Sequence, residues 1–475
     1  MMKKLPILLI SLISLLTACA RPTPSVIEKV IKVKVFVTAT PAPTPTPIVI
    51  EKVVTKVVTR EALLFTNHEG QTLEELVLRL YPNFGPATEG IAYKDRMQVG
   101  GVTVNGEPVE IGYIASNTAV VAPLPHPLAP DATIRLELDF AMSLGPAYKE
   151  RWELASFYPL LAIYDETGWR KDIAPEGDLV YSESGLHVVE FTLPGDMVVA
   201  ASGTEVTTYS NSDGTVTHTF LAPGLRDFAL AFGEALQRVQ ANVDGVTIYL
   251  WHSPNDPLVE AKLRAVADAV QGFDRSFGSY PYADLDIVTK FDPEWWGPAG
   301  AGVEYPGLVF YTHGEENWEY NLVHEVAHQW WFSVVGNDVH LEPWLDEALA
   351  DYSAFIYFHE FHGEDEAKRA FQKNVLEDYE MGLAAGRISG KEPVGLSVYD
   401  LPPRDAMYFW IVYGKGALFL DALQREMEDE VFFEFLQEYY RRYKYKVATG
   451  EGFLGVAEQV AGRELDELYD TWVRK

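Results

Sequence analysis

The stretch HEVAHQWWFSVVGNDVHLEPWLDEALADY, residues 324–352, opens with two histidines four positions apart and a glutamate directly after the first. Positions four apart differ by about 40° around a helix axis, so a helix predicted over residues 318–335 projects both imidazoles from one face. The pattern is typical of a metal-binding helix in which His324 and His328 are ligands and Glu325 is a general base. For this motif alone, two hydrogen-bonded histidines of an ordinary buried helix remain the alternative.

A third candidate ligand, Glu347, follows His328 after eighteen intervening residues. A Gly-Asn-Asp run and a proline between them turn the chain, and a second helix predicted over residues 345–361 carries Glu347 in its first turn. Two histidines and one glutamate leave the fourth position of a zinc ion open to water, which distinguishes a catalytic from a structural site. Asp351 lies one helical turn further on and is placed to accept a hydrogen bond from a ligating imidazole, with a solvated carboxylate as the alternative.

The chain has 475 residues, a formal net charge of -31 and 48% apolar residues. This apolar content is sufficient for two or more domains with their own cores. A surface this acidic repels nucleic acid and anionic lipid head groups, so we exclude a phosphate-backbone partner. The single cysteine, Cys19, excludes a disulfide within the chain.

The N-terminus has the organisation of a bacterial lipoprotein signal. Two lysines precede an apolar stretch, residues 5–16, that is too short to span a bilayer. The sequence LTAC at residues 16–19 resembles a lipobox, in which Cys19 becomes lipidated. We expect residues 1–19 to be a lipoprotein signal peptide and the protein to be anchored to a membrane at the bacterial cell surface or periplasmic face. A plain secretory signal is the alternative.

Residues 20–60 lack the pattern of a domain. Two near-copies, VIEKVIKVKV and VIEKVVTKVV, flank the run PAPTPTP. Alternating prolines favour an extended, stiff chain. We expect a stalk, with an edge strand added to the following domain as the alternative.

Two domains follow, and the period of their hydrophobic residues differs. Residues 61–240 carry alternating apolar residues and hairpin signals such as Asn-Gly at 105–106, and predict an antiparallel β-rich domain. One exception is a capping box at residues 72–75, which predicts a short helix. Residues 241–475 are predicted to form a mostly helical domain with a small sheet, so the fold class is α+β. Helices are predicted over residues 257–278, 318–335, 345–361, 365–382, 413–427, 429–444 and 452–474.

The segments HEVAHQWW and WLDEALADY resemble the zinc aminopeptidases related to aminopeptidase N and to leukotriene hydrolase, which are gluzincin metallopeptidases. In that family an HExxH motif is followed by eighteen residues and a glutamate within WLNEGFA. Residues 299–307, AGAGVEYPG, are similar to the family's G-x-M-E-N loop, and residues 412–420, VYGKGALFL, to its Y-x-K-G-A stretch. Residues 277–288 are similar to the segment that leads into the catalytic domain. The likeness begins near residue 61 and is densest over 277–420.

The resemblance implies a saddle-like N-terminal β domain and a thermolysin-like peptidase domain, in a short two-domain form without the family's usual C-terminal helical domain. It implies one zinc ion as cofactor and peptides with a free N-terminus as substrates. Glu325 would deprotonate the attacking water, and Tyr413 would stabilise the oxyanion. Glu304 would bind the substrate α-amine, and the backbone at Gly302 would hold the peptide extended. The implied zinc ligands are His324, His328 and Glu347.

The chain departs from the family pattern at four positions around these motifs. Val303 and Tyr305 replace the methionine and asparagine of the loop, and Asp346 and Ala348 replace the asparagine and glycine that flank the third ligand. We expect a zinc aminopeptidase. A zinc endopeptidase or an epoxide hydrolase on the same scaffold is one alternative, and a non-catalytic peptide-binding surface lipoprotein is another. Glu325 argues against the last, because a binding protein needs no general base.

Overall fold

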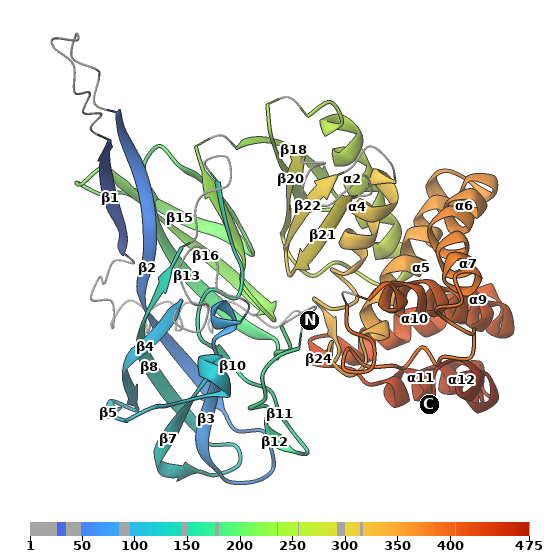
Figure 1. Ribbon diagram of the computed structural model, residues 1–475, viewed down its shortest axis with the longest axis horizontal. Coiled ribbons are helices and arrows are strands. Elements are labelled where there is room, and N and C mark those ends of the chain that lie inside the picture. The colour runs from blue at the N-terminus through green and yellow to red at the C-terminus, as the bar shows by residue number, and fades with distance from the viewer. Residues whose placement is uncertain are drawn as a thin grey trace, which may run out of the picture.

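The computed structural model of the protein is shown in Figure 1. The expected signal peptide, Cys19 and the centre of the expected stalk lie outside the residues that it describes. The described residues are 26–34, 49–84, 96–144, 151–175, 180–234, 236–254, 256–291, 300–313, 317–403 and 405–474.

The N-terminal region is built from antiparallel strands, as predicted (Figure 1). Among the described residues, one sheet has the order β1-β2-β8-β4-β5 and a second the order β10-β3-β7-β6. Two three-stranded sheets, β13-β16-β15 and β14-β17-β9, and the ribbon β11-β12 complete the region. The strands are β1 Val26–Lys34, β2 Val49–Thr66, β3 Leu73–Arg79, β4 Met97–Val104, β5 Glu107–Pro108, β6 Gly112–Ile114, β7 Ala119–Leu128, β8 Thr133–Ser143, β9 Arg151–Leu154, β10 Leu160–Leu161, β11 Tyr164–Asp165, β12 Gly168–Trp169, β13 Gly185–Pro194, β14 Val198–Ala201, β15 Thr204–Ser210, β16 Thr215–Leu225 and β17 Leu230–Gly233.

Strand β8 illustrates how the alternating apolar residues of the N-terminal region produce a sheet. Ile134, Leu136, Leu138 and Phe140 are buried, and the residues between them are more exposed. A side-chain period of two places these four residues on one face of the sheet, where they join the core.

Residues 20–60 were predicted to be either a stalk or an added edge strand, and the described parts of this segment form strands. β1 pairs with β2 in antiparallel register, and β2 continues past residue 60 to pair with β8 from Lys56 to Thr66. The first hairpin is therefore continuous with the sheet of the N-terminal region.

The prediction of a short helix at the capping box, residues 72–75, is wrong. Residues from Leu73 onward form β3, which pairs with β7, and Leu76 and Val77 are fully buried. Pairing with a neighbouring strand and burial of the apolar residues outweigh a local signal that contributes about 1 kcal/mol.

The second region begins with a five-stranded sheet of order β18-β19-β20-β22-β21. Its central strands are parallel, and β21 lies antiparallel to β22 at the edge. Helix α2, Val259–Ser276, connects β19 to β20, and α2 and α4 pack against the sheet (Figure 1). The strands of this second region are β18 Gln237–Val243, β19 Val246–His252, β20 Asp284–Phe291, β21 Gly300–Tyr305, β22 Leu308–His313, β23 Val335–Gly336 and β24 Lys446–Val447.

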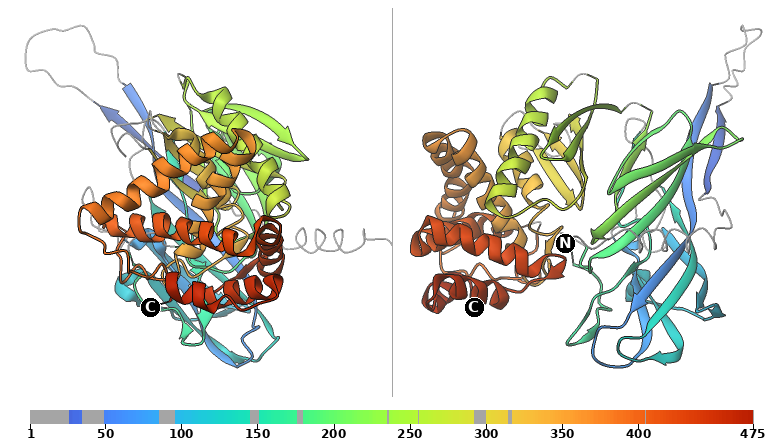
Figure 2. Two further views of the ribbon diagram at one scale, coloured as in Figure 1. Left: turned by 90° about the vertical axis from the view of Figure 1, so that its right-hand side faces the viewer. Right: turned by 180° about the vertical axis from the view of Figure 1, so that it is seen from behind.

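Most of the remaining chain is helical, and the right view of Figure 2 shows these helices on the opposite side of the molecule from the N-terminal sheets. The predicted α+β class is confirmed. The helices are α4 Trp318–Ala327, α5 Trp344–Phe361, α6 Glu364–Phe371, α7 Glu377–Ala384, α8 Ala406–Tyr408, α9 Gly416–Met427, α10 Asp429–Tyr443, α11 Gly450–Ala461 and α12 Asp466–Trp472, with π-helical turns η4 Gln372–Leu376 and η5 Phe409–Lys415.

The histidine helix is shorter than predicted. Helix α4 ends at Ala327, and His328 caps it. The prediction of continuous helix to residue 335 is wrong because the chain tightens into turns after Ala327, where the N–H groups of Gln329 and Trp330 donate to carbonyls three residues back. It then leaves helical geometry altogether at Phe332, whose φ is 114°.

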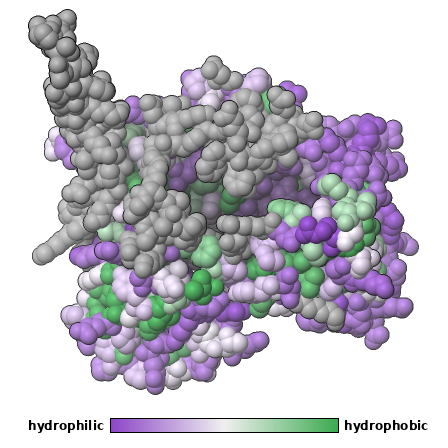
Figure 3. Space-filling model, in the orientation of Figure 1, coloured by the Kyte–Doolittle hydropathy of each residue, from purple (hydrophilic) through white to green (hydrophobic). Residues whose placement is uncertain are grey.

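Hydrophilic side chains cover much of the helical side of the face in Figure 3, in agreement with the net charge of -31. Within the described ranges, no helix combines the length and the apolar character that crossing a bilayer requires.

Candidate metal centre and active site

Helices α4 and α5 bring the three predicted ligands together. The Nε2 atoms of His324 and His328 lie 3.0 Å apart, and Oε2 of Glu347 lies 3.2 Å from each of them. Two atoms bound to zinc at about 2.0–2.1 Å in a tetrahedral arrangement are about 3.3 Å apart. All three residues are buried, so the donor atoms form a preorganised cluster with the dimensions of a zinc site.

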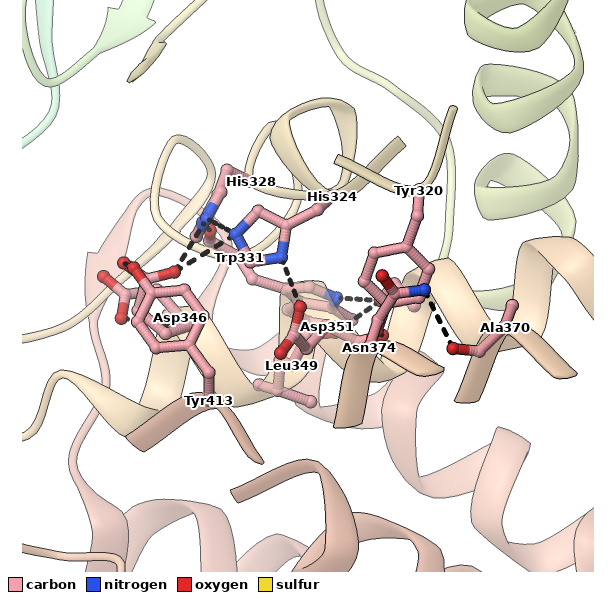
Figure 4. A network of polar contacts seen from close by, with 12 residues as sticks. Tyr320, His324, His328, Trp331, Asp346, Leu349, Asp351, Ala370, Asn374 and Tyr413 are labelled. Atoms are coloured by element: carbon pink, nitrogen blue, oxygen red, sulfur yellow. Dashed lines mark hydrogen bonds and ion pairs between the residues drawn. The ribbon is translucent and has the colours of Figure 1, made fainter. Parts of the chain in front are cut away.

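The opposite ring nitrogens fix how the two imidazoles are oriented (Figure 4). Nδ1 of His324 lies 2.9 Å from Oδ1 of Asp351, and Nδ1 of His328 lies 3.1 Å from the carbonyl oxygen of Trp331. Both acceptors engage an N–H at Nδ1, which directs each Nε2 at Glu347 and leaves it as the ring nitrogen that can bind a metal. Asp351 therefore accepts the hydrogen bond from a ligating imidazole that the sequence predicted. The acceptor for His328 is a backbone carbonyl, that of Trp331, which side-chain patterns do not indicate.

Glu325 lies beside these ligands and is 7% exposed. Among the described residues, its Oε2 has no hydrogen-bond partner. Burial raises the pKa of Glu325, although His324 and His328 act to lower it. A buried carboxylate with a raised pKa is suited to accept and return a proton near neutral pH.

Strand β21 passes directly over Glu325 at Gly302. A Cβ atom at residue 302 would lie 2.2 Å from Cδ of Glu325. The glycine is therefore required by the close approach of the strand to the general-base candidate, which is a second reason for its presence beside the backbone role that the resemblance implies.

Glu304 follows on the same strand and is 7% exposed. One oxygen of its carboxylate lies within 4.8 Å of donor atoms of Glu325 and His328. The amide of Gln329 ties this strand to the histidine segment: it accepts from the N–H of Gly307 at 2.8 Å and donates to the carbonyl of Tyr305 at 3.1 Å. Gln329 was not singled out by sequence reasoning, and its place directly after the motif is the signal that could have found it.

Tyr413 lies in the π-helical turn η5. Its hydroxyl donates to Oε1 of Glu347, and its ring stacks on His324 with centroids 5.7 Å apart. Phe409 and Tyr408 pack against the Tyr413 ring. Tyr408 is buried, so its ring is part of the packing around Tyr413.

The four departures from the family pattern occupy different places. Val303 is 38% exposed and Tyr305 is half-buried, so both side chains of β21 reach the protein surface. Asp346 is 1% exposed and accepts from the N–H of Glu347 at 2.8 Å, while Ala348 is fully buried. Asp346 therefore contacts the backbone of the third ligand rather than solvent.

Residues 307–472 match the model of the Peptidase family M1 domain. Aminopeptidase M1-D of Oryza sativa subsp. japonica is 26% identical over 209 residues, which are 41% of this chain and 23% of that protein. Glutamyl aminopeptidase of Rattus norvegicus is 25% identical over 378 residues, which are 72% of this chain and 38% of that protein. The chain thus spans well under half the length of these relatives.

Solved structures share the fold over most of the chain. An M1 zinc metallopeptidase from Deinococcus radiodurans has a TM-score of 0.65 and 21% identity, and the match covers 89% of this chain and 90% of that one. A mutant of an M1 zinc metallopeptidase from the same organism, bound to a Tyr-Ser-Ala substrate, has a TM-score of 0.63 and 21% identity, with 88% and 90% covered. The two-domain architecture implied by the sequence motifs is confirmed.

Proposed function

We propose that this chain, whose residues 307–472 form a Peptidase family M1 domain, is a zinc aminopeptidase that removes N-terminal residues from peptides. The observation that carries the proposal is the position of Glu304, whose carboxylate shares one buried cluster with Glu325 and His328. This acidic group lies beside the hydrolytic centre, where it can recognise a free α-ammonium group. The relatives named as aminopeptidases support the same activity.

The buried donor set of His324, His328 and Glu347 fits one zinc ion. Both Nε2 atoms and one carboxylate oxygen are spaced as a tetrahedral site needs, and the Nδ1 atoms are engaged elsewhere. A zinc ion held there supplies a Lewis acid that polarises the scissile carbonyl and makes water more acidic.

Glu325 acts as the general base and then as the general acid. It takes a proton from the attacking water and returns it to the nitrogen of the departing peptide. Its burial and raised pKa match both steps, since an ordinary carboxylate is too weak a base near neutral pH. Its unpaired Oε2 is available for this exchange.

Glu304 limits cleavage to the first peptide bond. Its carboxylate binds the α-ammonium group of the substrate, and an internal peptide bond offers no charge at that point. A substrate bound in this way extends along β21. Among the described residues β21 is an edge strand, so its outer side can pair with an extended peptide. Gly302 allows this edge to lie close to Glu325.

Tyr413 donates its hydroxyl to the oxyanion that forms at the attacked carbonyl. In the present structure the hydroxyl donates to Glu347, so it already points toward the metal ligands. One such donor contributes about 3 kcal/mol to transition-state stabilisation.

The decisive experiment compares aminoacyl fluorogenic amides with the same compounds N-acetylated, using zinc-loaded protein. We expect turnover of the free amines alone. Equal turnover of acetylated substrates would indicate an endopeptidase instead. Absence of any turnover by the zinc-loaded protein would support a peptide-binding protein.

We also propose that the protein is a lipoprotein held at the bacterial cell surface or periplasmic face through Cys19. The LTAC sequence that precedes and includes this only cysteine supports the proposal. Metabolic labelling with palmitate should mark the wild-type protein and not Cys19→Ser. Equal labelling of both would leave the cysteine without this role.

A further inference from the structure

Arg226 of the N-terminal region extends into the catalytic region. It follows β16 directly and is 2% exposed. Nε donates to the carbonyl of Phe332 at 2.9 Å, and Nη2 donates to the carbonyl of Lys446. Nη1 donates to the carbonyl of Ser182 at 2.8 Å within its own region. A buried guanidinium thus joins the β domain to the segment that follows the second histidine ligand.

Phe332 has an unusual backbone conformation at this contact. Its φ of 114° is sterically unfavourable for a side chain that bears a Cβ. Such a residue costs about 1–3 kcal/mol and persists only where its surroundings hold it. The ring is 5% exposed, and the N–H of Phe332 donates to the carbonyl of Val335 at 2.8 Å. Arg226 holds the other side of the same residue.

The two peptide units that flank Cα of Phe332 both bond to His328. The carbonyl of Trp331 accepts from Nδ1 of the His328 ring at 3.1 Å. The N–H of Ser333 donates to the backbone carbonyl of His328 at 3.0 Å. The peptide that supplies this N–H is the one whose carbonyl Arg226 binds. A rotation of that peptide would break the Ser333 bond directly and, through Cα of Phe332, shift the neighbouring peptide whose carbonyl orients the His328 ring.

The space for the guanidinium is provided by Gly336. A Cβ atom at that position would lie 2.2 Å from Cζ of Arg226. A second arginine of the N-terminal region also contacts this loop, since Nη2 of Arg170 lies 2.9 Å from Oδ2 of Asp338. Both arginines of the β domain thus hold the segment between the second and third ligands.

We propose that Arg226 is a positioning residue for the metal ligand His328, so that the N-terminal domain sets the affinity of the metal site. The proposal rests on the proposed zinc site. Arg226 touches no ligand side chain, and it acts through the backbone of Trp331, Phe332 and Ser333. Loss of the guanidinium should let the strained peptide relax and turn the His328 ring from its direction toward Glu347.

The test measures zinc affinity by competition with a chelator in the full chain, below the unfolding temperature, for Arg226→Met and Arg226→Lys. Removing a group that orients a metal ligand typically weakens binding about 10–100-fold, and we expect this for Arg226→Met, with a smaller loss for lysine. The control is Arg463→Met, which removes an exposed arginine paired with Glu426 at 2.7 Å and should leave affinity unchanged. The visible spectrum of the Co²⁺-loaded protein reports the ligand geometry independently.

A folded Arg226→Met variant with wild-type zinc affinity and Co²⁺ spectrum would overturn the inference. If that variant does not fold, Arg226→Lys and Gly336→Ala decide, because the new methyl group displaces the guanidinium. Wild-type affinity in both would overturn it equally. Failure of the wild-type chain to bind zinc would refute the proposed function itself, so the two failures are distinguishable.

Discussion

Nδ1 of His324 on α4 lies 2.9 Å from Oδ1 of Asp351 on α5, the helix that also carries Glu347. One helix therefore supplies both the third ligand and the carboxylate that orients the first. Tyr320 strengthens the same junction, because its hydroxyl donates to the backbone carbonyl of Asp351 at 3.0 Å. The packing of α4 on α5 and the geometry of the metal site depend on each other.

We expect Asp351→Asn to weaken zinc binding about 10–100-fold while the protein remains folded. The amide keeps the shape of the side chain but lacks the negative charge that favours the N–H of the imidazole at Nδ1. A chelator competition titration measures the change. Glu430→Gln, an exposed position on α10, is the matched control. Equal zinc affinity in the two variants would mean that Asp351 does not act on the ligand.

Glu304→Gln tests the recognition of the substrate amine. We expect kcat/KM for free aminoacyl amides to fall about 10–100-fold, because a hydrogen bond to a charged group contributes about 1.5–3 kcal/mol. The discrimination against N-acetylated substrates should fall with it. Zinc content serves as the control and should remain that of wild type. Retained discrimination would assign amine recognition to another residue.

Tyr413→Phe should lower kcat about 100–1000-fold with little change in KM, since the lost donor acts on the oxyanion and not on the bound substrate. Steady-state kinetics separate the two constants. Tyr408→Phe is the comparison, because Tyr408 packs against the Tyr413 ring. A loss confined to KM would place the Tyr413 hydroxyl in substrate binding instead.

Gly302→Ala introduces a methyl group 2.2 Å from Cδ of Glu325. We expect a loss of about 100-fold in activity, the size typical of a 1 Å displacement of a catalytic group. Circular dichroism should show an intact fold. The paired control is Gly455→Ala on α11, where the added atom meets nothing within 4 Å. Full activity in Gly302→Ala would show that β21 can move without consequence.

Zinc removal should destabilise the protein, because the buried donors of α4 and α5 lose the ion that joins them. At free zinc about 1,000 times Kd, the bound metal contributes about 4 kcal/mol to the free energy of unfolding. Thermal unfolding with and without chelator measures the effect. Glu325→Gln should show the same stabilisation as wild type, since Glu325 is not among the three ligands. An unchanged melting temperature after chelation would argue against a zinc site in this cluster.

The convergence of His324, His328 and Glu347 could be predicted because it depends on local features. A helical period places the histidines on one face, and helix-breaking residues turn the chain before the glutamate. The resemblance of these motifs to the M1 family is confirmed. Side-chain chemistry and spacing along the sequence were sufficient here.

Other features depend on contacts that spacing does not reveal. The capping box at residues 72–75 does not start a helix, because the chain from Leu73 onward pairs with β7. Arg226 lies 106 positions before Phe332, and both of its acceptors in the catalytic region are backbone carbonyls, which carry no sequence signature. Gln329 acts on the backbone of Tyr305 and Gly307 in the same way.

The π-helical turn η5 makes the position of Tyr413 depend on chain length as well as on residue type. A π turn contains one residue more than an α turn, and each residue advances the direction of a side chain by about 100°. Deleting any one residue between Phe409 and Tyr413 would restore a regular helix and swing the phenol away from Glu347. An insertion or deletion here would therefore abolish the proposed activity even if every functional side chain were retained.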